Sequence, residues 1–122
     1  MLPVPGHTLD GVISFRDIGD VERMVEATLE RFGALHCASN NAASGAGFQF
    51  LTKIDAPNWQ RAIDVSLTGV WLCMKYEIPA MQQSGGGSIV NVASVSGMRG
   101  ESLQAAYSAS KADEIKQAFS QA

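Results

Sequence analysis

The sequence is short of cysteine, of basic residues and of long apolar runs, and each shortage excludes a class of protein. Two cysteines, Cys37 and Cys73, are too few for the disulfide framework of a small secreted domain, so a reducing cytoplasm is the expected location. Nine basic residues against twelve acidic ones give a net charge of −3, which excludes a basic nucleic-acid-binding domain. No apolar stretch reaches the roughly 18 residues of a membrane span. The first residues also lack the basic flank and apolar block of a signal peptide.

The 122 residues suffice for one domain with a buried core, and we treat residues 1–122 as a single domain. Short β-like runs alternate with longer helical ones. Strands are predicted over residues 12–15, 35–39 and 88–93. Helices are predicted over residues 20–32, 57–83 and 104–122. This β-α-β-α-β-α order, with apolar strands that do not alternate strictly, is typical of a parallel α/β sheet with helices on its faces.

Local signals set the expected ends and breaks of these helices. Asp20 is the expected N-cap of the first helix, and Gly33 its expected end. Gly69 and Pro79 indicate that the second helix is bent or divided. The apolar stripe expected on the first helix consists of Val21, Met24, Val25, Leu29 and Phe32.

Three polar residues near the end of the chain could perform proton transfer. Ser94 follows the third predicted strand, and Tyr107 and Lys111 lie one turn apart on the last helix, so they share a face. An ammonium group beside a phenol stabilises the phenolate, which lets the tyrosine exchange a proton with an alcohol or ketone oxygen. A serine hydroxyl could hydrogen-bond the same oxygen. A lone Tyr-x-x-x-Lys pair is a weak signal, because many such pairs are solvated surface pairs.

Together with neighbouring motifs, this set resembles the short-chain dehydrogenase/reductase family of Rossmann-type enzymes that use NAD or NADP. The family's Asn-Asn-Ala-Gly turn appears as residues 40–43, its serine segment as residues 89–97, and its Tyr-x-x-x-Lys as residues 107–111. Residues 64–70 resemble its central helix, and Asp17-Ile18 resembles its adenine-contacting dipeptide. The resemblance implies a partial Rossmann-type, doubly wound parallel sheet of about three strands with flanking helices.

The resemblance also implies roles for particular residues. Tyr107 would be the acid/base, Lys111 would assist it and bind the nicotinamide ribose, and Ser94 would polarise the substrate oxygen. The expected contacts with the adenosine half of the cofactor are Asp17, Ile18, Asn41 and Ala42. The reaction implied is the interconversion of a secondary alcohol and a ketone, on a small-molecule substrate. Asn40 is expected to brace the sheet.

The sequence departs from the family pattern at three points. Ser66 replaces the family's catalytic asparagine, and Ala43 stands where glycine is usual, which requires a negative φ there. The Gly-rich turn that cradles the pyrophosphate is absent, since the glycines at 45–47 and 85–87 lack its spacing. The family's first two strands and its late substrate-binding part have no counterpart here.

These departures leave alternatives open. A truncated, catalytically incompetent relative that acts through an interaction surface is one, and a lyase or isomerase using Tyr107 without net redox is another. A sheet lacking its neighbouring strands would expose apolar surface, so we expect a homo-oligomer, a complementing partner or low stability. The cysteines are expected to be buried and inert, and His7 and His36 are too isolated for a metal site.

Overall fold

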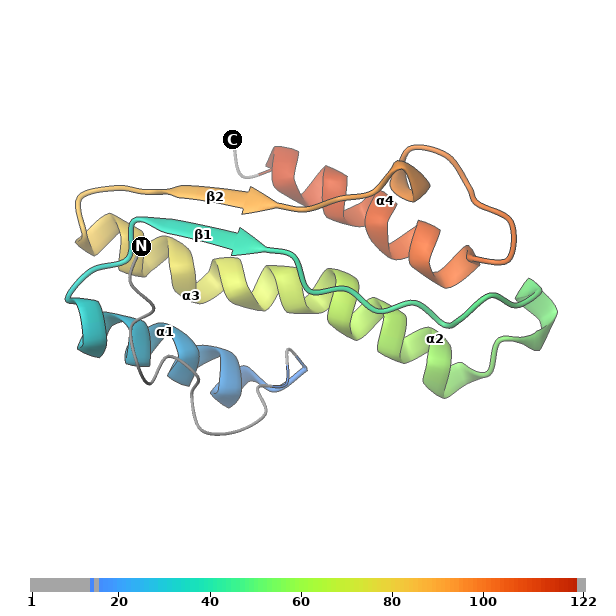
Figure 1. The fold of residues 1–122 in the computed structure, drawn as a ribbon, viewed down its shortest axis with the longest axis horizontal. Coiled ribbons are helices and arrows are strands. Elements are labelled where there is room, and N and C mark those ends of the chain that lie inside the picture. Colours follow the sequence, from blue (N-terminus) through green and yellow to red (C-terminus); the bar gives the residue numbers. More distant parts are fainter. Residues whose placement is uncertain (1–13, 15, 121–122) are drawn as a thin grey trace, which may run out of the picture.

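The computed structural model describes Ser14 and residues 16–120, and it confirms the α/β class (Figure 1). The elements follow in the order α1 (Ile18–Phe32), β1 (Cys37–Asn40), α2 (Ala56–Ile63), α3 (Gly69–Gln83), β2 (Ser88–Asn91) and α4 (Ala105–Ser120). Three short turns of helix connect them: η1 (Leu51–Lys53), η2 (Asp64–Thr68) and η3 (Val95–Gly97). The strand predicted over residues 12–15 lies outside the described residues except for Ser14, which is not in a strand.

Helix α1 begins earlier than predicted, because Asp17 and not Asp20 is its N-cap. The Asp17 carboxylate accepts a hydrogen bond from the Asp20 amide at 3.0 Å, which satisfies one of the free N–H groups of the first turn. Asp20 instead accepts from the amide of Ser14 at 2.9 Å and pairs with Arg23. At the other end, Gly33 adopts φ 79° and ends the helix as predicted.

The long middle helix is divided, as Gly69 suggested, but the division is a π-helical turn. Asp55 caps α2 by accepting from the Asn58 amide at 2.8 Å. The π turn η2 then joins α2 to α3 without a break in helical direction, and Pro79 lies inside α3. Single π turns inside helices often mark functional sites, which directs attention to η2.

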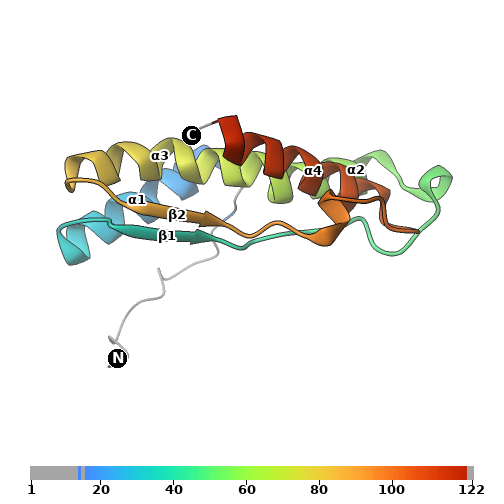
Figure 2. The ribbon, with the colours of Figure 1, turned by 90° about the horizontal axis from the view of Figure 1, so that it is seen from above.

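Strands β1 and β2 form a two-stranded parallel sheet with Cys37 opposite Ser88 and Asn40 opposite Asn91. Figure 2 shows α2, α3 and α4 on one side of this sheet. Side chains alternate accordingly: Ala38 and Asn40 face the helices, while Cys37 and Ser39 are exposed. The prediction that Cys37 is buried is therefore wrong, because its face of the strand has no covering layer; Cys73, on α3, is buried as predicted.

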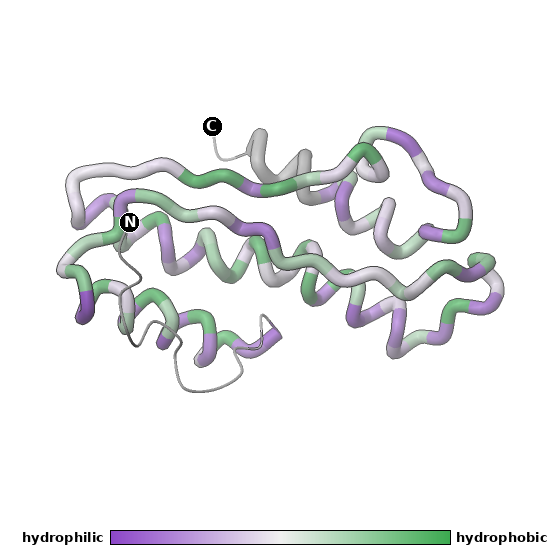
Figure 3. The backbone as a smooth tube through the Cα atoms, viewed as in Figure 1, coloured by the Kyte–Doolittle hydropathy of each residue, from purple (hydrophilic) through white to green (hydrophobic). Residues whose placement is uncertain are grey.

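Two small groups of buried side chains hold the helices together. Val21 of α1 packs against Leu72 and Cys73 of α3, and Ala46, Ala62 and Ala106 form a second group farther along. Large apolar side chains remain exposed on β2, on the segment after it and at the start of η1 with the loop before it: Val90, Val92, Val95, Met98, Phe48, Phe50 and Leu51. Figure 3 shows hydrophobic positions along these segments of the backbone. The expectation of exposed apolar surface is confirmed; Phe32, predicted on the apolar stripe of α1, is also 60% exposed.

Candidate active site

The carboxyl ends of the two strands are tied to each other and to α3. The Asn40 amide group donates to the Glu77 carboxyl at 3.0 Å and to the Asn91 side-chain oxygen at 3.0 Å. One residue later, the backbone N–H of Val92 donates to the Asn40 carbonyl at 2.9 Å. Asn40 thus braces the sheet as expected. It also holds together the two segments that follow β1 and β2. Loops at this edge are where α/β sheets bind ligands.

Lys111 connects α4 to the segment that leaves β2. The residue is 2% exposed, and its Nζ donates to the Val92 carbonyl at 2.8 Å. Ser94 lies two residues beyond Val92 and is half-buried, and its hydroxyl accepts from the Ser96 amide at 3.2 Å. Gly97 holds this segment against α4, because a Cβ there would lie 2.7 Å from the backbone of Lys111. The serine segment and α4 are therefore in direct backbone contact.

Tyr107 lies on the same face of α4 as Lys111, whose Nζ is 5.9 Å from the centre of the tyrosine ring. The ring is half-buried. The loop after β1 passes beside it, since a Cβ on Gly45 would be 3.6 Å from the Tyr107 Cβ. Together these contacts gather the Ser94 segment, Tyr107, Lys111 and the 40–47 loop around one end of α4.

Ser66, in the π turn, is fully buried and holds the loop after β1. Its hydroxyl accepts from the Ser44 amide at 2.9 Å and donates to the Ser44 carbonyl at 2.8 Å. The hydroxyl proton is thus engaged with the backbone. Ala43 has the negative φ that the sequence analysis required of it. Apart from glycines, only Leu103 among the described residues has a positive φ.

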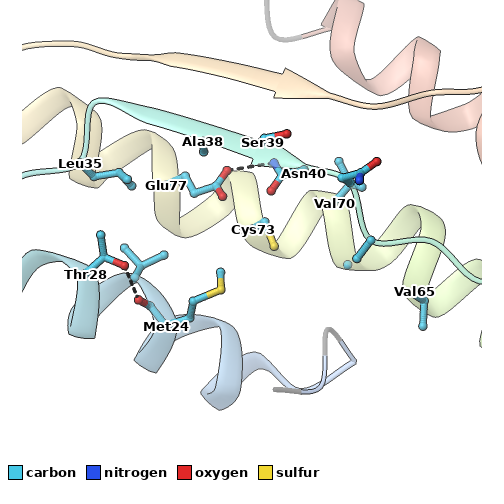
Figure 4. Close-up of a pocket in the computed structure, with 14 residues that line it drawn as sticks. Met24, Thr28, Leu35, Ala38, Ser39, Asn40, Val65, Val70, Cys73 and Glu77 are labelled. Carbon is cyan, nitrogen blue, oxygen red and sulfur yellow. Dashed lines mark hydrogen bonds between the residues drawn. The ribbon is translucent and has the colours of Figure 1, made fainter. Parts of the chain in front are cut away.

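The expected cofactor contacts lie in two other hollows. Asp17 lines an open polar hollow of about 420 Å³ at the start of α1, together with Arg16 and Asp64, which form an ion pair of 3.0 Å. Ile18 is 51% exposed beside it. Asn41 and Ala42 line a groove of about 310 Å³ between α1, β1 and α3 (Figure 4). Neither hollow is lined by Ser94, Tyr107 or Lys111. Within the described residues the expected site residues therefore lie in three separate places: these two hollows and the end of α4.

Two ionisable groups in the groove are perturbed by burial. Loss of solvent raises the pKa of the Cys73 thiol to about 12, and the neighbouring Glu77 carboxylate adds to this effect. Burial also raises the pKa of Glu77, although the hydrogen bond from Asn40 opposes the shift. Cys73 is therefore an unreactive thiol, as the sequence indicated.

Sequence reasoning missed two residues that organise this region, Glu77 and Gly97. Glu77 stands four residues after Cys73 on the buried side of α3, and a charged residue at such a position was the signal available. Gly97 gave no signal beyond being a glycine after the serine segment. The exposed Arg99 pairs with Glu101 at 3.1 Å and is a solvated loop residue.

Comparison with known proteins identifies the class. A family profile described as short chain dehydrogenase matches residues 12–117, and the chain belongs to this family. The members are oxidoreductases with a Rossmann-type fold, which agrees with the parallel sheet and its flanking helices. Among the described residues no helix has the length and apolarity needed to cross a membrane.

Individual relatives are similar over most of this chain. Cyclohexanol dehydrogenase of Acinetobacter sp. (strain SE19) is 40% identical over 92 residues, which are 75% of this chain and 37% of that protein. A short-chain dehydrogenase/reductase of Burkholderia phymatum, solved in complex with NAD, matches with a TM-score of 0.83 and 30% identity over 88% of this chain and 38% of that one. The solved structure of ElxO with NADP bound matches with a TM-score of 0.80 and 27% identity over 85% and 42%. The chain thus spans about two fifths of the length of these relatives.

Proposed function

We propose that this chain carries the proton-transfer site of an oxidoreductase that interconverts a secondary alcohol and a ketone with NAD or NADP. The observation that supports it best is the placement of Lys111. Its buried ammonium group lies near the Tyr107 ring and donates to the Val92 carbonyl, two residues before Ser94. The hydrogen bond fixes the position of this cation beside the tyrosine. Because the lysine is buried, solvent screens the interaction between the two side chains only weakly.

In this mechanism Tyr107 donates its phenolic proton to the carbonyl oxygen during reduction and accepts a proton from the alcohol during oxidation. Lys111 stabilises the phenolate form, and Ser94 donates a hydrogen bond to the substrate oxygen as negative charge develops on it. The nicotinamide cofactor, when bound, supplies or accepts the hydride. NAD and NADP are proposed for this chain because of its family and of the relatives solved with them.

The residues expected to hold the cofactor are compatible with it. Asp17 caps α1 through one carboxylate oxygen, and within the described residues its second oxygen has no hydrogen-bond partner. That oxygen could accept a hydrogen bond from the amino group of adenine.

A catalytically inactive relative is the second candidate, and Ser66 favours it. The family's asparagine at this position is replaced by a hydroxyl that is fully engaged with the backbone of Ser44. Such a protein would keep its fold and its surface without turning over substrate.

Thermal unfolding with millimolar NADH or NADPH tests the proposal. A ligand that binds the native state at a hundredfold excess over Kd stabilises it by about 2.7 kcal/mol. We expect one nucleotide to raise the unfolding temperature of the wild-type chain, and Lys111→Met to reduce that rise. Lys75→Met is the matched control, because Lys75 is exposed on α3. No rise with either nucleotide would contradict the proposal.

Turnover separates the candidates. Cyclohexanone serves as the probe substrate, because a matched relative is a cyclohexanol dehydrogenase. Oxidation of NADH or NADPH in step with alcohol formation supports the proposed reaction. Nucleotide binding without any turnover supports the inactive relative, and product formation without nucleotide consumption would indicate a lyase or isomerase.

A further inference from the structure

The side chain of Asn40 is held between α3 and β2. Its amide nitrogen donates to the Glu77 carboxyl and to the Asn91 side-chain oxygen, both at 3.0 Å. A side-chain amide nitrogen has two hydrogens, so these two bonds use both of them. Figure 4 shows Glu77 extending from α3 toward Asn40 at the end of β1. Glu77 therefore fixes the direction in which the Asn40 amide group points.

Asn40 in turn positions two consecutive residues at the end of β2. Its side chain donates to Asn91, and its backbone carbonyl accepts from the N–H of Val92 at 2.9 Å. The Asn91 amide group also donates to the Met74 sulfur on α3 at 3.3 Å. The end of β2 is thus held by both β1 and α3.

Val92 passes this positioning on to the lysine on α4. Its carbonyl accepts from Lys111 Nζ at 2.8 Å, and that Nζ lies 5.9 Å from the centre of the Tyr107 ring. The side chains along this route are buried, with Glu77 4% exposed and Lys111 2% exposed. Hydrogen bonds in such a buried network strengthen and rigidify one another. Glu77 and Lys111 are therefore connected through Asn40 and Val92.

Stability does not explain an acid at position 77. Glu77 lines a groove that is mainly apolar, with Met24 and Val25 from α1 and Val70 from α3. A carboxyl group in such surroundings lowers stability unless it is hydrogen-bonded. Replacement of buried charged groups by apolar residues of similar volume is often neutral or stabilising. What Glu77 supplies at this position, and an apolar residue would not, is an acceptor for Asn40.

We propose that Glu77 is a positioning residue for the pair of Tyr107 and Lys111. Through Asn40 it fixes the Val92 carbonyl, and that carbonyl holds the Lys111 ammonium group beside the tyrosine. The role requires the acceptor oxygen of Glu77 and its reach, and it does not require its charge. The effect on reaction rate rests on the proposed function, whereas the position of Lys111 is measurable without any turnover.

The test compares substitutions that separate these properties in the full 122-residue chain. Glu77→Gln keeps an acceptor oxygen at the same reach and removes the charge. Glu77→Leu removes the acceptor and fits the apolar groove. Glu26→Leu is the matched control, because Glu26 is exposed on α1. If Glu77→Leu does not fold, Glu77→Asp replaces it, since this variant keeps the charge but is one methylene too short to reach Asn40.

Two measurements report the position of Lys111 in the absence of cofactor. Acetic anhydride labelling, quantified by mass spectrometry, measures the accessibility of Lys111 relative to Lys75, which is exposed on α3. Hydrogen exchange of the Val92 amide measures its bond to Asn40, because local opening exposes that amide. The amide of Leu72, in the group of side chains between α1 and α3, is the reference for general loss of stability.

We expect Glu77→Leu to raise both Lys111 labelling and Val92 exchange at least tenfold, with exchange at Leu72 unchanged. Glu77→Gln and Glu26→Leu should behave like the wild type. In cyclohexanone reduction, the kcat of Glu77→Leu should fall at least tenfold and that of Glu77→Gln should be retained.

Three results would overturn the proposal. The first is unchanged labelling and exchange in Glu77→Leu, and the second is equal acceleration at Leu72, which would indicate a merely structural role. The third is the same loss in Glu77→Gln, because the charge would then be what matters. A wild-type chain without turnover would contradict the proposed function alone, and labelling and exchange would still decide the role of Glu77.

Discussion

The ammonium group of Lys111 donates a hydrogen bond to the backbone carbonyl of Val92, 2.8 Å away and 19 residues earlier in the chain. This bond joins α4 to the end of β2 where the serine segment begins. Because the lysine is 2% exposed, the bond gives its buried ammonium group a fixed hydrogen-bond acceptor. The relative position of Ser94 and Tyr107 depends on this connection and on the close contact at Gly97.

Tyr107→Phe should abolish turnover with little effect on the fold. The change removes only the phenolic oxygen, which makes no hydrogen bond within the described part of the chain. Loss of an acid/base group lowers the rate by about 100-fold or more. Reduction of cyclohexanone, followed by nicotinamide absorbance, measures the rate, and urea unfolding measures stability. Turnover retained in the variant would remove Tyr107 from the mechanism.

Gly97→Ala should destabilise the protein by roughly 1–3 kcal/mol, because the new Cβ meets backbone that cannot move independently. The added carbon would lie 2.7 Å from the backbone carbon and oxygen of Lys111. Gly100→Ala is the matched control, since a Cβ there meets nothing within 4 Å. Urea unfolding of both variants checks the prediction, and equal stability of the two would show that η3 is free to shift from α4.

Glu77→Gln should flatten the dependence of stability on pH. Burial raises the pKa of Glu77 in the folded state above its ordinary value, so the folded state holds the proton more tightly than the unfolded one. The stabilisation that protonated Glu77 provides is complete below the ordinary pKa of glutamic acid. It is lost as the pH rises through the raised pKa of Glu77 in the folded state. The urea midpoint of the wild type should fall over this window more than that of the variant. If the urea midpoints of the wild type and the variant depended on pH in the same way, Glu77 would not be the group responsible.

Ser66→Ala should loosen the loop that follows β1. The substitution leaves the amide and the carbonyl of Ser44 without their buried partner, which destabilises by roughly 1–3 kcal/mol. Faster hydrogen exchange of the Ser44 amide would locate the effect in the loop. Ser102→Ala is the control, because Ser102 is exposed. An unchanged exchange rate at Ser44 would mean that the loop is held by other contacts.

The helices were largely predictable because their signals are local. Gly33 terminates α1 where the left-handed conformation is required, and Pro57 stands in the first turn of α2, where a helix tolerates proline. The N-cap of α1 was misplaced by three residues, because Asp17 and Asp20 are both good caps and only the geometry shows which one accepts an amide. The π turn carries no comparable sequence signal, since its hydrogen bonds differ from those of an α-helix by a single residue.

By itself the sequence determined the α/β order, the family, and the pairing of Tyr107 with Lys111 on one helix face, because these depend on spacing along the chain. Only the tertiary structure decided that Cys37 is exposed, that Glu77 is buried beside Asn40, and that Lys111 reaches the Val92 carbonyl. Burial and long-range hydrogen bonds depend on which elements cover one another. Among the described residues the helices cover one face of the sheet, and the buried Glu77 lines a groove between β1, α1 and α3.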